Sequence, residues 1–203
     1  MLHNREELQK ARQVYAEALN AEEKKILVCA GTGCVSSGSL EIFDKLTQLM
    51  QEKGISCSVE LEQEPHHDVV GMKKSGCHGF CEMGPLIRIE PQGWLYVKVK
   101  PEDCEEIVEK TISNGEHIER LAYQKGKTIC QKQDDIPFYK KQTRLVLNHC
   151  GHIDANSIKE YLAVGGYSAF EKALFDMTAD EIITEISESN LRGRGGGGFP
   201  AGR

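Results

Sequence analysis

The chain has 203 residues, eight cysteines and a formal net charge of −6 at pH 7. The negative charge argues against nucleic acid as the main partner, and no stretch approaches the roughly 20 apolar residues that span a bilayer, so we expect no membrane insertion. The charged N-terminal segment predicts no secretory signal, and we therefore expect a cytoplasmic, reducing location in which cysteines bind metal instead of forming disulfides.

Residues 4–20 show the first periodic pattern, which is that of an amphipathic helix. Apolar side chains recur at helical spacing along one stripe, while the opposite face mixes Glu, Lys, Arg and Gln. We interpret residues 1–24 as a segment that carries an ordinary packing helix.

Two glycine-rich loops carry four of the cysteines. The first reads Cys29-Ala-Gly-Thr-Gly-Cys34 and the second reads Gly76-Cys77-His-Gly-Phe-Cys81. Glycine permits backbone angles that let several thiolates converge, and four thiolates bind a [2Fe–2S] cluster, a [4Fe–4S] cluster or a tetrahedral zinc ion. The wide, glycine-lined first pair favours iron–sulfur, and the alternatives are zinc and, after it, disulfides or unrelated thiols.

Residues 25–114 alternate strand and helix patterns. We expect strands at 25–30, 55–62, 86–90 and 94–99, with helices at about 39–52 and 101–113. Gly54 should end the first helix, and Pro91-Gln-Gly93 should form a turn. The order fits an α/β fold with a half-open, thioredoxin-like sheet, and it also fits other small α/β folds.

The two cysteine loops resemble those of a known family. Residues 25–114 are similar to the thioredoxin-like [2Fe–2S] ferredoxin domain in the NADH-oxidising modules of complex I and of multimeric hydrogenases. The matching segments run from Cys29 to Ser39 and from Ser75 to Pro85. The resemblance implies that one [2Fe–2S] cluster is held by Cys29, Cys34, Cys77 and Cys81.

The other cysteines suggest packing roles. Cys57 lies in an apolar alternation typical of a half-buried strand, and Cys104 lies in a helix that opens with proline and acids. Cys130 and Cys150 fall in a connecting region without enough nearby ligands for a metal site. We interpret His78 as a residue that supports the cysteines or lies at the surface, not as a ligand.

Residues 115–150 are interpreted as a connector. Glycine and proline interrupt it, it is locally basic near Arg144, and its Ile136-Pro-Phe-Tyr139 segment should pack against a neighbouring surface. Beyond it, Ser157-x-x-Glu160 and Thr178-x-x-Glu181 fit capping boxes, which predict two helix starts, and a further helix is expected at about 167–175.

The last residues form a glycine-rich tail. The tail satisfies a G-x-G-x-x-G pattern, but a helix precedes it and Pro200 follows, so we reject a Rossmann fingerprint. A flexible linker is one reading. The other is a loop whose backbone N–H groups and arginine bind phosphate. The residues concerned are Gly193, Arg194, Gly195, Gly196, Gly197, Gly198 and Phe199.

A second resemblance covers residues 145–203. They are similar to the start of the flavin- and NADH-binding subunit of the same enzymes, through segments 151–154, 158–167 and 191–202. The resemblance implies that the loop at 193–198 wraps FMN and that Phe199 flanks the nicotinamide site. A [2Fe–2S] domain ahead of a flavin domain implies the NADH-binding subunit of an electron-bifurcating [FeFe]-hydrogenase, a formate dehydrogenase or a complex I-like NADH dehydrogenase.

The expected organisation is therefore an N-terminal helix (1–24), a thioredoxin-like [2Fe–2S] domain (25–114), a connector (115–150) and a truncated helical start of an FMN- and NADH-binding domain (151–203). Because the chain stops at Arg203 inside the flavin loop, we expect it to be incomplete and not catalytic alone.

The expected function is relay of single electrons through the cluster, within an NADH:acceptor oxidoreductase that holds FMN and NAD(H) when complete. No catalytic acid, base or nucleophile is expected. Partners would be other subunits of such an assembly, with ferredoxin a further candidate. The alternative is a structural zinc or assembly module without redox turnover.

Overall fold

The computed structural model describes residues 3–62 and 69–203, and the chain divides into two compact units. The larger unit spans Lys10–Val164, and the smaller combines the residues up to Gln9 with Gly165–Arg203. None of the described helices is long and apolar enough to cross a membrane.

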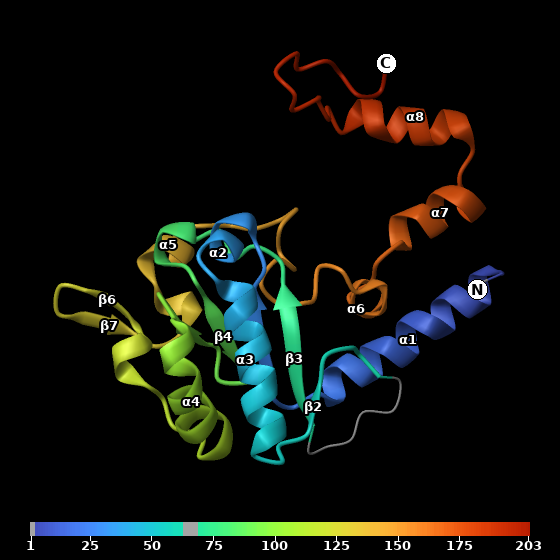
Figure 1. The fold of residues 1–203 in the computed structure, drawn as a ribbon. Coiled ribbons are helices and arrows are strands. Elements are labelled where there is room, and N and C mark those ends of the chain that lie inside the picture. The colour runs from blue at the N-terminus through green and yellow to red at the C-terminus, as the bar shows by residue number, and fades with distance from the viewer. Residues whose placement is uncertain (1–2, 63–68) are drawn as a thin grey trace. The chain divides into compact units, whose positions relative to one another are not determined.

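A five-stranded sheet lies at the centre of the larger unit, in the order β2-β3-β1-β4-β5 (Figure 1). β1 is parallel to β3, β3 is parallel to β2, and β4 and β5 continue the sheet in antiparallel pairs. The strands are β1 (Lys25–Cys29), β2 (Cys57–Ser58), β3 (Val70–Ser75), β4 (Ile87–Glu90) and β5 (Trp94–Tyr96). This α/β arrangement agrees with the predicted half-open sheet.

Three details of the sheet differ from the sequence prediction. The strand expected at 94–99 ends at Tyr96. Within the expected strand at 55–62, only Cys57–Ser58 pairs with the sheet. The strand β3 was not predicted at all. Its middle residue Lys73 is fully buried, with Nζ 2.9 Å from Oε1 of Glu22 and 3.2 Å from Oε1 of Glu160. These two carboxylates, which come from distant parts of the sequence, allow a lysine to be buried in the strand. Because a lysine breaks the hydrophobic pattern of a strand, the pattern did not predict β3.

Helices complete the core of this unit. α3 (Ser39–Glu52) lies across one face of the sheet in Figure 1 and buries Ile42, Phe43, Leu46 and Met50. Gly54, with φ of +70°, follows it as predicted. The predicted helix at 101–113 is continuous but changes pitch, with a 3₁₀ turn (Pro101–Asp103), α4 (Cys104–Glu106) and a π-helical stretch (Ile107–Ser113).

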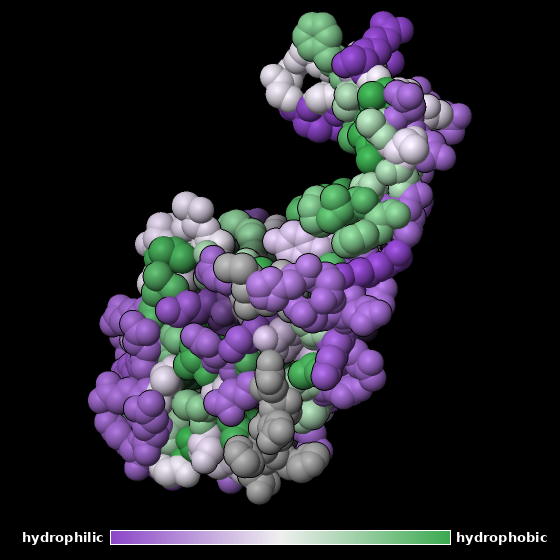
Figure 2. Space-filling model, turned by 90° about the vertical axis from the view of Figure 1, so that its right-hand side faces the viewer, coloured by the Kyte–Doolittle hydropathy of each residue, from purple (hydrophilic) through white to green (hydrophobic). Residues whose placement is uncertain are grey.

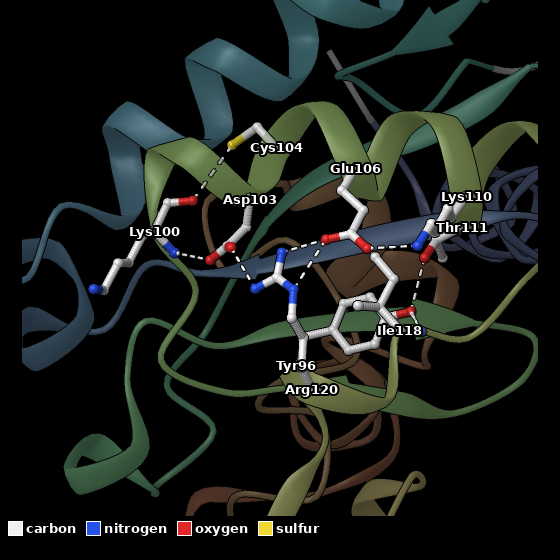
Figure 3. Close-up of polar contacts among 9 residues, drawn as sticks. All are labelled: Tyr96, Lys100, Asp103, Cys104, Glu106, Lys110, Thr111, Ile118 and Arg120. Carbon is white, nitrogen blue, oxygen red and sulfur yellow. Dashed lines mark hydrogen bonds and ion pairs between the residues drawn. The ribbon is translucent and has the colours of Figure 1, made fainter.

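Polar contacts fasten residues 115–121 to this helical run. Figure 3 shows Arg120 reaching Asp103, at 2.6 Å, and also Glu106. On the other side, the Tyr96 hydroxyl lies 2.7 Å from Oγ1 of Thr111 and accepts a hydrogen bond from the backbone N–H of Ile118. The connector therefore starts as an ordered continuation of the domain.

The rest of the connector is folded onto the sheet. It contains a hairpin of β6 (Tyr123–Lys125) and β7 (Thr128–Cys130), a 3₁₀ turn (Gln133–Asp135) and α5 (Pro137–Lys140). The β5 N–H of Leu95 donates to the Gln131 carbonyl at 2.8 Å. α6 (Ile158–Ala163) ends the unit, and Ser157 caps it by accepting from the Glu160 N–H, as the capping pattern predicted.

Three further helices are α1 (Arg5–Ala21), α7 (Ser168–Asp176) and α8 (Ala179–Glu188). Within the smaller unit, Arg5 forms ion pairs with Glu171 and Asp176, each at 2.7 Å. The capping box of Thr178 and Glu181 is fully formed at the start of α8. Four apolar side chains of α7 and α8 are exposed: Phe170, Leu174, Phe175 and Ile183. Figure 2 shows green, hydrophobic surface in this part of the chain.

Candidate metal centre

The fold brings the two cysteine loops to one edge of the sheet. Cys29 ends β1 and is paired in register with Ser75, which ends the parallel strand β3. Because parallel strands finish at the same edge, the loops that follow them meet there. Cys34 lies on the short helix α2 (Thr32–Ser36), and Cys77 and Cys81 follow β3, the latter opening a 3₁₀ turn (Cys81–Met83).

The four thiols are linked in a row, from Cys34 through Cys29 and Cys77 to Cys81. The Cys29 thiol contacts those of Cys34 and Cys77, and the Cys77 thiol also contacts that of Cys81. In the described part of the chain, no group of three or more His, Cys, Asp or Glu side chains is arranged around a single metal ion. The cysteines thus form a row of neighbouring sulfurs.

One cysteine of this group, Cys29, has a lowered pKa that favours its thiolate form. The pKa of Cys29 falls to about 6, chiefly because the Cys34 thiol hydrogen-bonds to its sulfur, helped by the backbone N–H groups of His78 and Gly31. The pKa of Cys34 is raised for the same reason, since Cys34 keeps the shared proton. Thiolates are the metal-binding form of cysteine, so a donor is present at neutral pH before any metal arrives.

Burial raises the pKa of Cys77, and the hydrogen bond from the Gly79 N–H, at 3.3 Å from Sγ, opposes the rise. Cys29 and Cys34 are buried, whereas Cys77 and Cys81 are exposed. The site therefore has one pair facing the core and one pair facing solvent.

Three glycines make room for the cysteines. A Cβ added at Gly31 would lie 2.8 Å from Cβ of Cys77, and one at Gly84 would lie 2.7 Å from Sγ of Cys34. A Cβ at Gly33 would lie 3.1 Å from Cβ of Cys81. A larger residue at Gly31 or Gly84 would displace the neighbouring cysteine, and one at Gly33 would crowd Cys81. Four thiols in a cradle of glycine fit a sulfur-ligated iron cluster.

His78 lies behind the cysteines and is fully buried, so the surface option in our prediction was wrong. Its Nδ1 is 3.0 Å from Oε1 of Gln133, which can only accept, so Nδ1 carries the proton. Its Nε2 is 2.9 Å from Oγ of Ser75. Burial lowers the pKa of His78 to about 4, which keeps the ring neutral. Both nitrogens are thus engaged in supporting the loop.

The connector packs directly on the second cysteine loop. Phe80 stacks on Phe138, with ring centroids 4.5 Å apart, and meets the edge of Tyr139 at 5.7 Å. The predicted packing role of the 136–139 segment is confirmed. Arg144 reaches the same loop and donates from Nη2 to the His78 carbonyl oxygen at 2.6 Å. Sequence patterns did not single out Gln133 or Arg144 as site residues, because neither lies near a cysteine ligand in the sequence.

The other four cysteines lie outside this row. Cys57, Cys104 and Cys130 are packed as expected. Cys104 is fully buried, and burial raises its pKa to about 11. Cys57 packs against the edge of the main core, and Cys130 belongs to the apolar cluster around Phe80. Cys150 lies near Gly76, with Sγ 3.7 Å from the position of an added Cβ.

The glycine-rich tail forms a closed loop in the smaller unit. The Gly193 N–H donates to the Phe199 carbonyl at 2.9 Å, and the Ala201 N–H donates to that of Leu191 at 2.8 Å. A Cβ at Gly195, Gly196 or Gly198 would meet no heavy atom within 4 Å. Phe199 is 79% exposed. The seven predicted residues at 193–199 therefore lie in one hydrogen-bonded loop that is exposed to solvent.

Comparison with known proteins places the larger unit. The profile of the thioredoxin-like [2Fe–2S] ferredoxin family matches residues 15–112. A 2Fe–2S ferredoxin of Aquifex aeolicus is 36% identical over 115 residues, which cover 53% of this chain and 95% of that protein.

Two longer proteins match through shorter segments. The NADP-reducing hydrogenase subunit HndC of Solidesulfovibrio fructosivorans is 48% identical over 63 residues, 31% of this chain and 13% of that protein. An NADH-quinone oxidoreductase subunit of Aquifex aeolicus is 58% identical over 48 residues, 24% of this chain and 11% of that protein. The chain thus spans nearly all of the ferredoxin but a small part of either longer relative.

Proposed function

We propose that this chain, which belongs to the thioredoxin-like [2Fe–2S] ferredoxin family, binds its cluster through the cysteines of the two glycine-rich loops, Cys29, Cys34, Cys77 and Cys81. Membership of this family gives the general function, which is ferredoxin-type electron transfer on a [2Fe–2S] cluster. The cluster, when bound, accepts and releases one electron at a time.

The meeting of the two loops carries the proposal. Of the eight cysteines, these four contact one another in sequence along the row, and three glycines lie where a side chain would displace them. A row of four neighbouring thiols suits a two-iron cluster, which takes four cysteine ligands. His78 and Gln133 hold the second loop, and the buried rings of Phe80 and Tyr139 pack behind it.

Metal analysis of anaerobically purified protein tests this assignment. We expect about two irons and two sulfides per chain, a red-brown colour, and a paramagnetic one-electron signal after dithionite. Alanine at any one of the four cysteines should lose or disrupt the cluster. Cys104→Ala is the matched control, because that thiol is buried away from the row and should leave the cluster in place.

Zinc in place of iron, in protein never exposed to oxygen, would contradict the assignment and favour a structural zinc module. A cluster retained in each of the four alanine variants would instead show that other residues hold it.

We further propose that the chain works as the electron-relay part of an NADH:acceptor oxidoreductase subunit of the hydrogenase, formate dehydrogenase or complex I-like kind. Similarity to HndC and to the NADH-quinone oxidoreductase protein supports this placement. In this proposal the loop at 193–199 is the FMN-facing edge of the flavin domain, with backbone N–H groups and Arg194 turned to phosphate. The exposed apolar faces of α7 and α8 support packing against further protein.

A further inference from the structure

We infer that Arg144 sets the reduction potential of the cluster, by polarising the peptide group that donates a hydrogen bond to Cys77. The inference rests on the proposed cysteine ligands. Arg144 lies in the connector, outside the segment that the ferredoxin profile matches, and acts as a positioning residue.

A single peptide group links the arginine to the cysteine. The His78 carbonyl and the Gly79 N–H belong to the same peptide bond. Nη2 of Arg144 donates to that carbonyl oxygen at 2.6 Å. The N–H at the other end donates to Sγ of Cys77 at 3.3 Å. A chain of hydrogen bonds polarises its members, so the guanidinium makes this N–H a stronger donor to the sulfur.

The geometry of the loop keeps the chain of hydrogen bonds intact. Gly79 has φ of +81°, a backbone conformation that favours glycine over other residues at this point of the loop. A Cβ at Gly79 would lie 3.1 Å from Nη2 of Arg144, so the absence of a side chain also admits the guanidinium.

The arginine is held from its other side. Its guanidinium carbon lies 5.2 Å from the centre of the Tyr139 ring, a cation–π contact, and Nε lies 3.4 Å from Oε1 of Gln142. No carboxylate forms an ion pair with Arg144 within residues 3–62 and 69–203. Its positive charge is therefore not cancelled locally.

The consequence for electron transfer follows from charge. Reduction adds one negative charge to the cluster and its thiolates. A nearby cation and a stronger N–H donor both favour that added charge, so both raise the potential, as hydrogen bonds to cluster sulfurs do in general.

Redox titration of three variants, monitored by electron paramagnetic resonance, tests the inference. Arg144→Met removes charge and donor, Arg144→Gln removes the charge alone, and Arg144→Lys keeps both. In Arg144→Met we expect the equilibrium constant for reduction to fall about tenfold, which lowers the reduction potential by about 59 mV for one electron. The potential of Arg144→Gln should lie between those of Arg144→Met and the wild type, and the potential of Arg144→Lys should stay near that of the wild type. Lys141→Met is the control, because the side chain of that neighbouring lysine has no hydrogen bond or ion pair in the described part of the chain.

A second readout separates polarisation from loop collapse. Pulsed resonance detects the exchangeable N–H proton next to Cys77, and its coupling should weaken in Arg144→Met while iron content stays the same. If the Met variant loses its cluster, the Gln and Lys variants decide: a lower potential in Gln supports the inference, and equal potentials overturn it.

If Arg144→Met is fully loaded with cluster and its potential is unchanged, the inference is overturned and the cysteine assignment still stands. The same holds if Lys141→Met shifts the potential as much as Arg144→Met does. A wild-type chain that holds no iron–sulfur cluster overturns both.

Discussion

Gly84 shows how tightly single residues are fitted around the cysteines. Its backbone, with φ of −70°, is one that any residue adopts, so the requirement for glycine does not come from conformation. It comes from space, because an added Cβ would stand 2.7 Å from Sγ of Cys34. Gly76 has the same freedom from strain, but its added Cβ would meet Ala155 at an ordinary 3.6 Å.

Gly84→Ala should therefore lower the iron content per chain and destabilise the protein by about 1–3 kcal/mol, the usual cost of overpacking. Gly76→Ala, next to Cys77, should change neither. Iron assay and urea unfolding of the two variants measure the difference. Equal iron content in both would show that the Cys34 thiol can move aside without cost.

The sequence predicted the cysteines of the site but not the residues that hold the cysteine loops in place. The cysteines and glycines stand out because their spacing is local. Gln133 and Arg144 come from the connector and reach His78 only after the chain has folded back. Their partners are a ring and a backbone carbonyl, which leave no pattern in the sequence.

Among the elements, β3 depends on a buried group of charges. Lys73 is fully buried between Glu22, just after α1, and Glu160 of α6. Glu160 also accepts from the Asp154 N–H at 2.7 Å, which ties α6 to the loop before it. The helices expected at 39–52 and 167–175 were predictable because apolar spacing and flanking glycines are local signals in the sequence. β3 was not, because its lysine is neutralised from residues far along the chain.

Lys73→Met should destabilise the protein by about 3–5 kcal/mol at pH 7, because two carboxylates lose their buried cation. Lys53→Met is the control, since Lys53 pairs with Glu109 at the surface, where such pairs contribute about 0–1 kcal/mol. Chemical denaturation at pH 7 compares the two. A loss in Lys73→Met no larger than that in the control would contradict the ion-pair account.

The pH dependence of the Lys73→Met defect gives a further check. Burial raises the pKa of Glu22 above its ordinary value of 4.5, against the lowering effect of Lys73. A carboxyl whose pKa is higher in the folded state contributes stability below its unfolded pKa and loses it as the pH rises through the folded value. Without Lys73 the folded pKa should rise further, so the defect should shrink as the pH is lowered towards 4.5.

For the molecule as a whole, the two units carry different parts of the proposed function. All four cysteines and their supports lie in Lys10–Val164, whereas the glycine-rich tail lies in the smaller unit. Binding pockets bury most of a ligand's surface, yet positions 195, 196 and 198 of the tail have no neighbouring atoms within 4 Å of an added Cβ.

We therefore expect the 203-residue chain to retain no FMN through gel filtration and to reduce no dye with NADH. Dithionite should still give the one-electron signal of the cluster, which serves as the internal control for loading. Flavin fluorescence of the eluted protein and dye absorbance measure the outcome. Stoichiometric FMN on this chain would mean that the described residues already make a flavin site.

Because the two cysteine pairs are unequally buried, reagents in solution approach the site from one side. Reagents in solution, such as an alkylating agent, dissolved oxygen or an iron donor, meet Cys77 and Cys81 first, whereas Cys29 and Cys34 are shielded by the protein. Damage would thus begin on the outer side of the row. Repair or loading from solution would approach from that side too, with the low-pKa Cys29 thiolate lying behind it.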